Sequence, residues 1–201
     1  MADRHNHYEA AFEAYLRQLR APYIAVNEHR RSILPEGASI KSLDFIVPSA
    51  GLAVWLVDVK GRRFPTGQKT PQYWTNWCTQ DELGSLDQWE QMFGLSFRGL
   101  LVFAYWVLAE KTPLPPEQLF CFRDQKYGFL GIPLLDYQAA SRQRSPRWQT
   151  VSIPVEEFRR RARPVHELLG RSWPPGLDWN EHIAAPSEAA RTSQTPSAED
   201  W

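Results

Sequence analysis

The chain has 201 residues, 43% of them hydrophobic, and its 23 basic and 23 acidic side chains give a formal net charge of zero. This length suits one domain with a packed core, or one domain plus a tail, and a net charge of zero by itself points to no class of partner. The two cysteines make no dense disulfide framework, and the longest apolar run, residues 99–109, is too short to span a bilayer. We therefore expect a cytoplasmic protein with no membrane partner and with reduced thiols, a single disulfide being the alternative.

The first part of the chain predicts one helix followed by three short strands. Apolar residues recur at helical spacing over residues 7–20, which indicates an amphipathic helix. Strands are predicted over 23–31, 42–47 and 52–60, with a turn at 34–39. We expect these strands to form a meander that packs against the first helix.

A second helix is predicted over residues 79–94, after a loop over 61–78. Thr79 and Glu82 fit a capping box, and Gly94 is a typical helix stop. The remaining elements are expected in this order: a strand buried on both faces over 99–108, strands over 118–123 and 127–137, a loop over 141–147, a strand over 148–153, and a helix over 154–169 that Pro164 breaks or kinks.

Two charged residues stand in the third predicted strand, where the sequence reads LAVWLVDVK. Side chains two positions apart in a strand point to the same face, so Asp58 and Lys60 share a face with the apolar Leu56. Burying a carboxylate and an ammonium there is costly unless they are paired or bind an ion. This pattern makes the strand a candidate site, although an isolated Asp-x-Lys is also typical of a surface ion pair.

Two further acidic residues precede this strand and complete a candidate metal site. Asp44 belongs to the second predicted strand, and Glu9 lies on the first helix. Carboxylates and a backbone carbonyl are suitable ligands for Mg²⁺, whose remaining positions are filled by water. A bound metal ion polarises a phosphate and lowers the pKa of an attacking water, and a lysine beside that water orients it and stabilises negative charge.

This constellation resembles the PD-(D/E)xK nuclease superfamily, and in particular its archaeal Holliday-junction-resolvase-like members. Asp44 stands at the first metal-binding Asp, residues 58–60 stand as the (D/E)xK element fourteen positions later, and Glu9 corresponds to a helical Glu. The segment HYEAAFE at residues 7–13 also resembles the signature of the small uncharacterised HYExAFE family. The resemblance covers about residues 7–110. Leu43 stands where the name-giving Pro would be, and Asp58 stands where Glu is commoner.

The resemblance implies an α/β, restriction-endonuclease-like fold with a mixed central sheet flanked by helices. It implies Mg²⁺- or Mn²⁺-dependent hydrolysis of DNA phosphodiester bonds, with structured or branched DNA as the substrate and a homodimer as the assembly. Asp44, Asp58 and the Val59 carbonyl would bind the metal, and Glu9 would bind it directly or through water. Lys60 would position and activate the nucleophilic water. Glu13, four residues after Glu9 on the same helix face, is an alternative to it.

Basic and aromatic residues suggest where nucleic acid would lie. Phosphate contacts are expected from Arg31, Arg62 and Arg63, and base stacking from Tyr73 and Trp74. The basic run at residues 158–163 is a weaker candidate, because a solvated helix face is the commoner explanation for such a run.

The domain organisation is predicted from composition. Residues 1–173 would form one nuclease-like domain, and the Pro/Ser/Ala-rich residues 174–201 would form a tail that is disordered from about residue 186. Two other functions stay open: a nuclease-fold module that binds nucleic acid or serves as a scaffold without catalysis, and a metal-independent enzyme that uses the carboxylates as acid and base.

Overall fold

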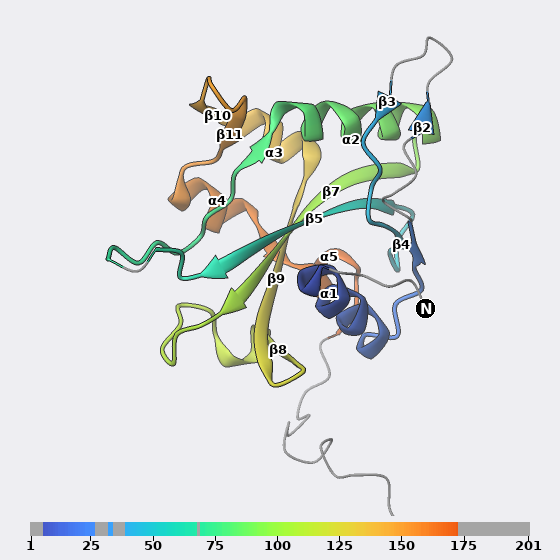
Figure 1. Ribbon diagram of the computed structural model, residues 1–201. Helices are drawn as coiled ribbons and strands as arrows, with labels where there is room; N and C mark the ends of the chain where they lie inside the picture. Colours follow the sequence, from blue (N-terminus) through green and yellow to red (C-terminus); the bar gives the residue numbers. More distant parts are fainter. Residues whose placement is uncertain (1–5, 27–31, 34–38, 68, 173–201) are drawn as a thin grey trace, which may run out of the picture.

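The computed structural model describes residues 6–26, 32–33, 39–67 and 69–172. Helices cover the two faces of a twisted central sheet (Figure 1). The helices are α1 (His7–Gln18), α2 (Gln80–Phe93), the 3₁₀ turn η1 (Pro116–Gln118), α3 (Leu134–Ala140), α4 (Val155–Arg161) and α5 (Val165–Leu168). The strands are β1 (Ile24–Ala25), β2 (Ser32–Ile33), β3 (Ser39–Ile40), β4 (Phe45–Pro48), β5 (Val54–Phe64), β6 (Cys78–Thr79), β7 (Phe97–Val107), β8 (Leu119–Phe122), β9 (Gln125–Pro133), β10 (Arg142–Ser145), β11 (Thr150–Ser152) and β12 (Arg163–Pro164).

The central sheet has the strand order β1-β4-β5-β7-β9-β12, and β8 pairs with β9. The strands β5 and β7 are parallel because α2 connects them, and the other neighbouring pairs are antiparallel. A smaller sheet has the order β10-β11-β6, and β2 pairs with β3. The predicted α/β class with a mixed central sheet flanked by helices is confirmed, as is the antiparallel meander of β1, β4 and β5.

The central sheet separates two apolar cores. Along β5, Leu56 and Phe64 belong to the core covered by α2, α3 and α4, whereas Val57 and Val59 belong to the core covered by α1 and α5. This division follows from the alternation of side chains along a strand. The strand β7 lies between β5 and β9 and is buried on both faces, as its continuous apolar sequence predicts.

Helix α1 packs one apolar stripe on the second of these cores. The Asn6 side chain caps the helix by accepting a hydrogen bond from the Tyr8 N–H, and Phe12 and Leu16 are fully buried. Close approach to β5 depends on Gly61, because a Cβ atom there would overlap the Tyr8 ring. The α1 register, and with it the position of Glu9, is therefore fixed against β5.

Two expectations about the site strands are corrected by the structure. The strand β5 does not end at Lys60 but continues to Phe64, because it pairs with β7 over its whole length. Asp44 lies in a bend just before β4 rather than inside the strand. It still extends the strand pairing, since its N–H donates to the Val57 carbonyl over 2.9 Å.

The C-terminal half differs more from the sequence-based prediction. The strand predicted over 127–137 ends at Pro133, and α3 follows with Leu134 and Tyr137 buried on one face. The loop predicted over 141–147 contains β10, and the helix predicted over 154–169 divides into α4 and α5, as Pro164 suggested. Three predicted segments lie outside the described residues: the turn over 34–39 except for Ser39, which begins β3, most of the strand over 23–31, and the tail over 174–201.

Candidate functional site

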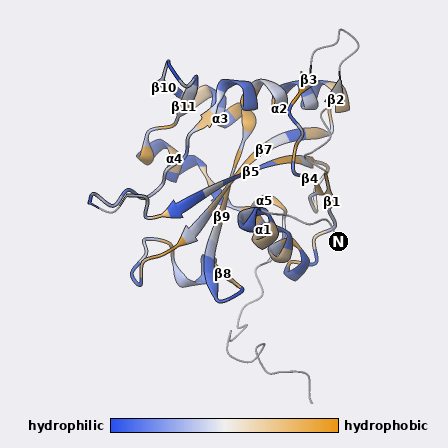
Figure 2. Cartoon of the chain, viewed as in Figure 1, coloured by the Kyte–Doolittle hydropathy of each residue, from blue (hydrophilic) through white to orange (hydrophobic). Residues whose placement is uncertain are grey.

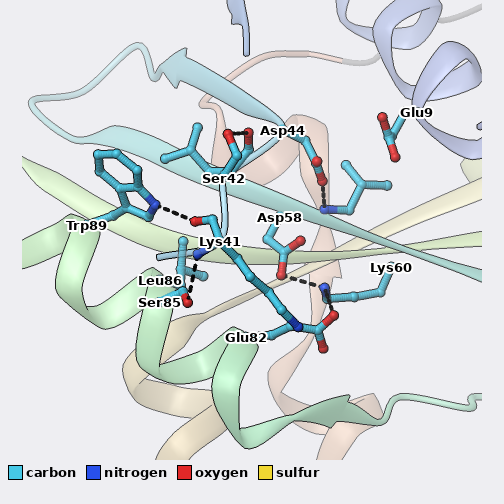
Figure 3. A pocket seen from close by; sticks show the side chains of 12 residues that line it. Glu9, Lys41, Ser42, Asp44, Asp58, Lys60, Glu82, Ser85, Leu86 and Trp89 are labelled. Carbon is cyan, nitrogen blue, oxygen red and sulfur yellow. Dashed lines mark hydrogen bonds and ion pairs between the residues drawn. The ribbon is translucent and has the colours of Figure 1, made fainter. Parts of the chain in front are cut away.

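A pocket of about 290 Å³ opens where β4 and β5 meet the first half of α2 (Figure 3). It is lined by twelve residues: Glu9, Lys41, Ser42, Leu43, Asp44, Asp58, Val59, Lys60, Glu82, Ser85, Leu86 and Trp89. The four side chains predicted as catalytic are all in this set. They reach the pocket from α1, from the bend before β4, and from β5, so the fold brings residues 9 and 60 of the sequence to one place.

Asp44 is held by the backbone of the neighbouring strand. Its Oδ2 accepts a hydrogen bond from the Val59 N–H over 2.6 Å, and the residue is only 6% exposed. Burial raises the pKa of Asp44 well above its ordinary value, and the charges of Asp58 and Glu9 raise it further. The Val59 N–H opposes this shift but does not cancel it.

Asp58 and Lys60 point to the same side of β5, as their spacing predicts. The Lys60 Nζ lies 2.7 Å from Asp58 Oδ2. Burial raises the pKa of Asp58, although the Lys60 ammonium lowers it in part. The buried Asp44 and the largely buried Asp58 are thus two acids of raised pKa that line the same pocket, and the charge of Asp58 disfavours ionisation of Asp44.

Glu82 is a member of this site that the sequence analysis placed only in a capping box. One carboxylate oxygen accepts the Thr79 N–H over 2.7 Å, and the other lies 2.9 Å from Lys60 Nζ. Burial would raise the pKa of Glu82, but Lys60 and the Thr79 N–H outweigh it and bring that pKa to about 2. Burial alone would also lower the pKa of Lys60, but the Asp58 and Glu82 carboxylates raise it, so Lys60 is an ammonium at neutral pH.

The position of Glu82 in the sequence could have identified it as a site residue. Glu82 lies in the first turn of α2, the first helix after β5. This helix packs on the face of β5 that carries Asp58 and Lys60. The capping box was sufficient to explain a Glu at position 82, so the contact of its carboxylate with Lys60 was not predicted.

Glu9 reaches the pocket from α1 and is 3% exposed. It is the third helical residue of α1, and the amide of the N-cap residue Asn6 donates to its Oε1 over 2.5 Å. Glu13 instead pairs with Arg17 at 2.6 Å and accepts a hydrogen bond from Tyr23. Of the two glutamates considered from the sequence, Glu9 is therefore the one at the pocket.

The donor set of the pocket suits a small hard cation that retains water. No group of three or more His, Cys, Asp or Glu side chains in the described parts of the chain is placed to hold a metal ion. Mg²⁺ commonly takes one or two carboxylates and keeps several waters, and Asp44 and Asp58 provide that number. A cation bound by both would also offset the repulsion between the Asp44 and Asp58 carboxylates, which raises the pKa of Asp44. The residues of the pocket therefore fit a Mg²⁺ ion.

The arginines predicted to contact nucleic acid lie in different environments. Arg62 is half-buried, donates to the carbonyls of Gly61 and Trp77, and stacks 4.3 Å from the Trp77 ring. Arg63 is exposed, with its guanidinium 5.6 Å from the Trp106 ring. Of these two arginines, Arg63 is the one whose charge faces water.

The two aromatic residues predicted for stacking pack largely on the core. Tyr73 and Trp74 both contact Phe64, with ring centroids 4.8 Å and 5.0 Å apart, and each is partly exposed. Arg31 falls outside the described residues. The nucleic-acid roles of all five predicted residues stay predictions.

A protein from an archaeon is among the solved structures that are similar to this chain. It is Hjc from Archaeoglobus fulgidus, a Holliday junction resolvase from an archaeal hyperthermophile. The two are 14% identical, the match covers 82% of this chain and 98% of that one, and the TM-score is 0.48.

No family model matches the sequence, and no curated protein matches it. The assignment to the HYExAFE family therefore stays a prediction. Within the described ranges, none of the helices combines the length and hydrophobicity needed to cross a membrane.

Proposed function

We propose that the protein is a metal-dependent nuclease that hydrolyses phosphodiester bonds of DNA. The observation that carries this proposal is the meeting of Asp44, Asp58 and Lys60 in one pocket, where two acids of raised pKa lie beside an ammonium. The cost of burying these groups makes a purely structural role a poor explanation for all three.

Asp44 and Asp58 would hold the metal ion, with the Val59 carbonyl as a third ligand. Of the two roles expected for Glu9, we propose the one through water, because no three His, Cys, Asp or Glu side chains of the described residues are placed to hold one ion. The ion, when bound, polarises the scissile phosphate and lowers the pKa of water in the pocket. The protein's contribution is to fix the carboxylates: Asp44 is anchored by the Val59 N–H, and Asp58 is set by the β5–β7 pairing.

Lys60 would act as an ammonium. Because Asp58 and Glu82 raise its pKa, it donates hydrogen bonds and does not accept a proton at neutral pH. It would orient the attacking water and stabilise the negative charge that grows on the phosphate oxygens. Glu82 would hold the Lys60 ammonium in place when Asp58 binds the metal ion.

The proposed substrate is structured or branched DNA, and the proposed assembly is a homodimer. Two strands that are cut symmetrically require two sites related by a twofold axis, which a symmetric dimer provides. Arg63 is exposed and lies three residues after Lys60 on β5, so it points to the opposite side of the sheet, the side covered by α1. It would contact a phosphate of this substrate outside the pocket.

Cleavage assays on a supercoiled plasmid and on a four-way DNA junction test this proposal. Wild-type protein should nick DNA with Mg²⁺ or Mn²⁺ and should stop in excess EDTA. Asp58→Asn and Lys60→Ala should each lower the rate by about 100-fold or more, since an interaction specific to the transition state is lost. Lys126→Ala, which removes an exposed lysine on β9, is the matched control and should cleave normally. Cleavage that is independent of metal, or unchanged in both site variants, would refute the mechanism.

A second candidate is a module that binds nucleic acid or serves as a scaffold without hydrolysis. The observation that favours it is that Lys60 already has two carboxylate partners, Asp58 and Glu82, so this part of the pocket is electrostatically satisfied without a metal ion. That candidate predicts DNA binding with no cleavage under any metal condition and no change of melting temperature with Mg²⁺.

A further inference from the structure

The positive charge of this neutral protein is concentrated in one stretch. Residues 142–163 contain seven Arg and two Glu, a net charge of +5, in a chain whose total is zero. Residues 142–152, which form β10, β11 and the turn between them, contain three Arg and no acid. We call residues 142–152 the arginine hairpin, and Figure 2 shows its β10 strand as strongly hydrophilic.

The arginines of this hairpin are not neutralised by neighbouring acids. Arg142, Arg144 and Arg147 are exposed, and none forms an ion pair with a carboxylate of the described residues. Two arginines of α4 differ, since Arg160 and Arg161 both pair with Glu157. The charge of the hairpin arginines is therefore available to a polyanion.

An exposed tryptophan accompanies these arginines. Trp148, in the turn of the hairpin, is 67% exposed, and the Arg147 guanidinium lies 5.2 Å from its ring. The face of an exposed aromatic ring is a good platform for an unstacked base. Arginines that bind phosphates beside an aromatic platform are the usual combination in proteins that bind single-stranded nucleic acid.

The hairpin is attached to the rim of the candidate active site. The strand β11 pairs with β6, where Thr150 lies opposite Thr79, and the Gln80 N–H donates to the Gln149 carbonyl over 2.9 Å. Thr79 is the N-cap of α2 and caps the same turn as Glu82, which holds Lys60. The chain of contacts from hairpin to Lys60 thus runs through one helix turn.

A side-chain contact makes a second link between the hairpin and β5. The Arg144 guanidinium lies 5.5 Å from the Trp77 ring, and the Arg62 guanidinium lies 4.3 Å from the same ring. Arg62 is two residues after Lys60 on β5 and points to the same side of the sheet. The hairpin therefore lies on the side of β5 that carries the candidate catalytic lysine.

We propose that the arginine hairpin binds an unpaired stretch of the DNA strand that flanks the cut site. Arg142, Arg144 and Arg147 contact its phosphates, and Trp148 stacks on one of its bases. The proposal rests on the proposed nuclease function and makes its substrate class more specific, namely DNA with an unpaired segment next to the scissile phosphate.

Binding is measured in EDTA, so that no metal-dependent cleavage occurs and the result does not depend on catalysis. The probes are three fluorescent DNA oligonucleotides of one sequence: a single strand, a blunt duplex, and a fork with single-stranded arms. The test variants are Trp148→Ala and the triple variant Arg142→Gln, Arg144→Gln, Arg147→Gln. The control is the triple variant Arg20→Gln, Arg98→Gln, Arg123→Gln, which removes equal charge from exposed sites elsewhere.

The hairpin triple variant should bind the single strand and the fork at least about 10-fold more weakly at roughly 100 mM salt. The slope of log K against log salt for the single strand should fall by about 2, which corresponds to three lost phosphate contacts. Trp148→Ala should weaken single-strand and fork binding about 5-fold or more while leaving duplex binding and the salt slope unchanged. The control triple variant should change binding less than the hairpin variant.

Several results would overturn the inference: hairpin variants that bind as tightly as wild type, an equal loss in the control triple variant, an equal effect of Trp148→Ala on the duplex, or no binding of any probe by wild type. The cleavage assay and the binding assay test different proposals. If wild-type protein binds unpaired DNA through the hairpin but cleaves no DNA, the proposed hydrolysis is wrong and the proposed binding surface stands.

Discussion

The charged residues of the pocket lie in largely buried positions, where apolar side chains would stabilise the fold better. The side chains of Asp44, Asp58, Lys60 and Glu82 are all largely buried. The Lys60 ammonium pairs with Asp58 and Glu82, whereas the Asp44 carboxylate is stabilised by the Val59 N–H and by a weaker attraction to Lys60. We therefore expect the ionised Asp44 to lower the stability of the metal-free protein.

The first prediction concerns the stability of Asp44→Asn without metal. The native pKa of Asp44 is raised above its ordinary value, so the stability that its proton provides is complete at low pH and is lost as pH rises through the raised pKa. Asn keeps an oxygen for the Val59 N–H and has no charge to lose. The variant should be more stable than wild type at pH 8, by about 1 kcal/mol or more.

Urea unfolding between pH 3 and pH 8 measures this difference. The advantage of Asp44→Asn should be near zero at the acid end and should grow with pH, while DNA cleavage by the variant is lost at every pH. A variant that is less stable than wild type at pH 8 would show that Asp44 is a structural residue.

The second prediction separates the two roles of Glu82. Glu82→Gln keeps an oxygen for the Thr79 N–H but weakens the hold on Lys60, so kcat should fall about 10-fold or more with little change in KM. Thr79→Val is the matched control, because it removes the hydroxyl that caps the Glu82 N–H and leaves the Lys60 partners in place.

Steady-state cleavage and thermal melting should be compared for both variants. Thr79→Val should lose about 1 kcal/mol of stability and keep its kcat. Equal losses of kcat in the two variants would mean that Glu82 acts only through the helix cap.

At the residue scale, sequence reasoning found the strand residues of the pocket more readily than its second helical carboxylate. Asp58 and Lys60 were predictable because a strand has a period of two, and charged residues on its apolar face have few structural explanations. Glu82 was missed because its capping box explained it locally. Arg62 is half-buried because β5 continues past Lys60, so the same alternation turns its side chain toward the core side.

Among the elements, α1 and β5 must keep a close contact for Glu9 to reach the pocket. That contact is the approach of the Tyr8 ring to Gly61, which leaves no room for a methyl group. The glycine is therefore required by packing rather than by backbone conformation.

The third prediction tests this contact. Gly61→Ala should lower stability by about 1–3 kcal/mol, because an overpacked interface must shift, and it should slow cleavage by moving Glu9. Gly84→Ala is the control: Gly84 is exposed within α2 with nothing within 4 Å of an added Cβ, so the change should stabilise by up to about 1 kcal/mol. A Gly61→Ala protein with wild-type stability and rate would show that α1 is not fixed by this contact.

Element types were predictable where the apolar period was unambiguous. The capping box and the apolar face of α2 identified that helix, and its bounds differ from the expected 79–94 by one residue at each end. The strand predicted over 127–137 is too long because the apolar residues of 134–137 follow β9 without a break. Strand pairing ends at Pro133, and Leu134 and Tyr137 then lie on one face of a helix. Two apolar residues three positions apart are too few to predict a helix directly after a long apolar strand.

For the whole molecule, the sheet order explains why residues from distant parts of the sequence meet. The parallel pairing of β5 with β7 places α2 over one face of the sheet, and α1 covers the other face. Both helices contribute residues to the pocket beside Asp44 and β5. Sequence alone predicted α1, α2 and the meander but not α3, and the hairpin β10–β11 beside α2 depends on the long-range pairing of β11 with β6. No local pattern predicts such a pairing.

The fourth prediction concerns stability with metal. A ligand that binds only the native state stabilises it by about 2.7 kcal/mol at a concentration of about 100 Kd, so millimolar Mg²⁺ should raise the melting temperature of wild type by several degrees. Asp44→Asn and Asp58→Asn should lose that response. A response that persists in both variants would place the ion elsewhere.

The most direct test is a crystal of the wild-type protein soaked in Mn²⁺, with anomalous diffraction recorded above the manganese edge. We predict a single strong anomalous peak in the pocket, in contact with both the Asp44 and the Asp58 carboxylates and absent from Asp44→Asn crystals. An empty pocket at saturating Mn²⁺, or a peak that touches neither carboxylate, would contradict the proposed metal site.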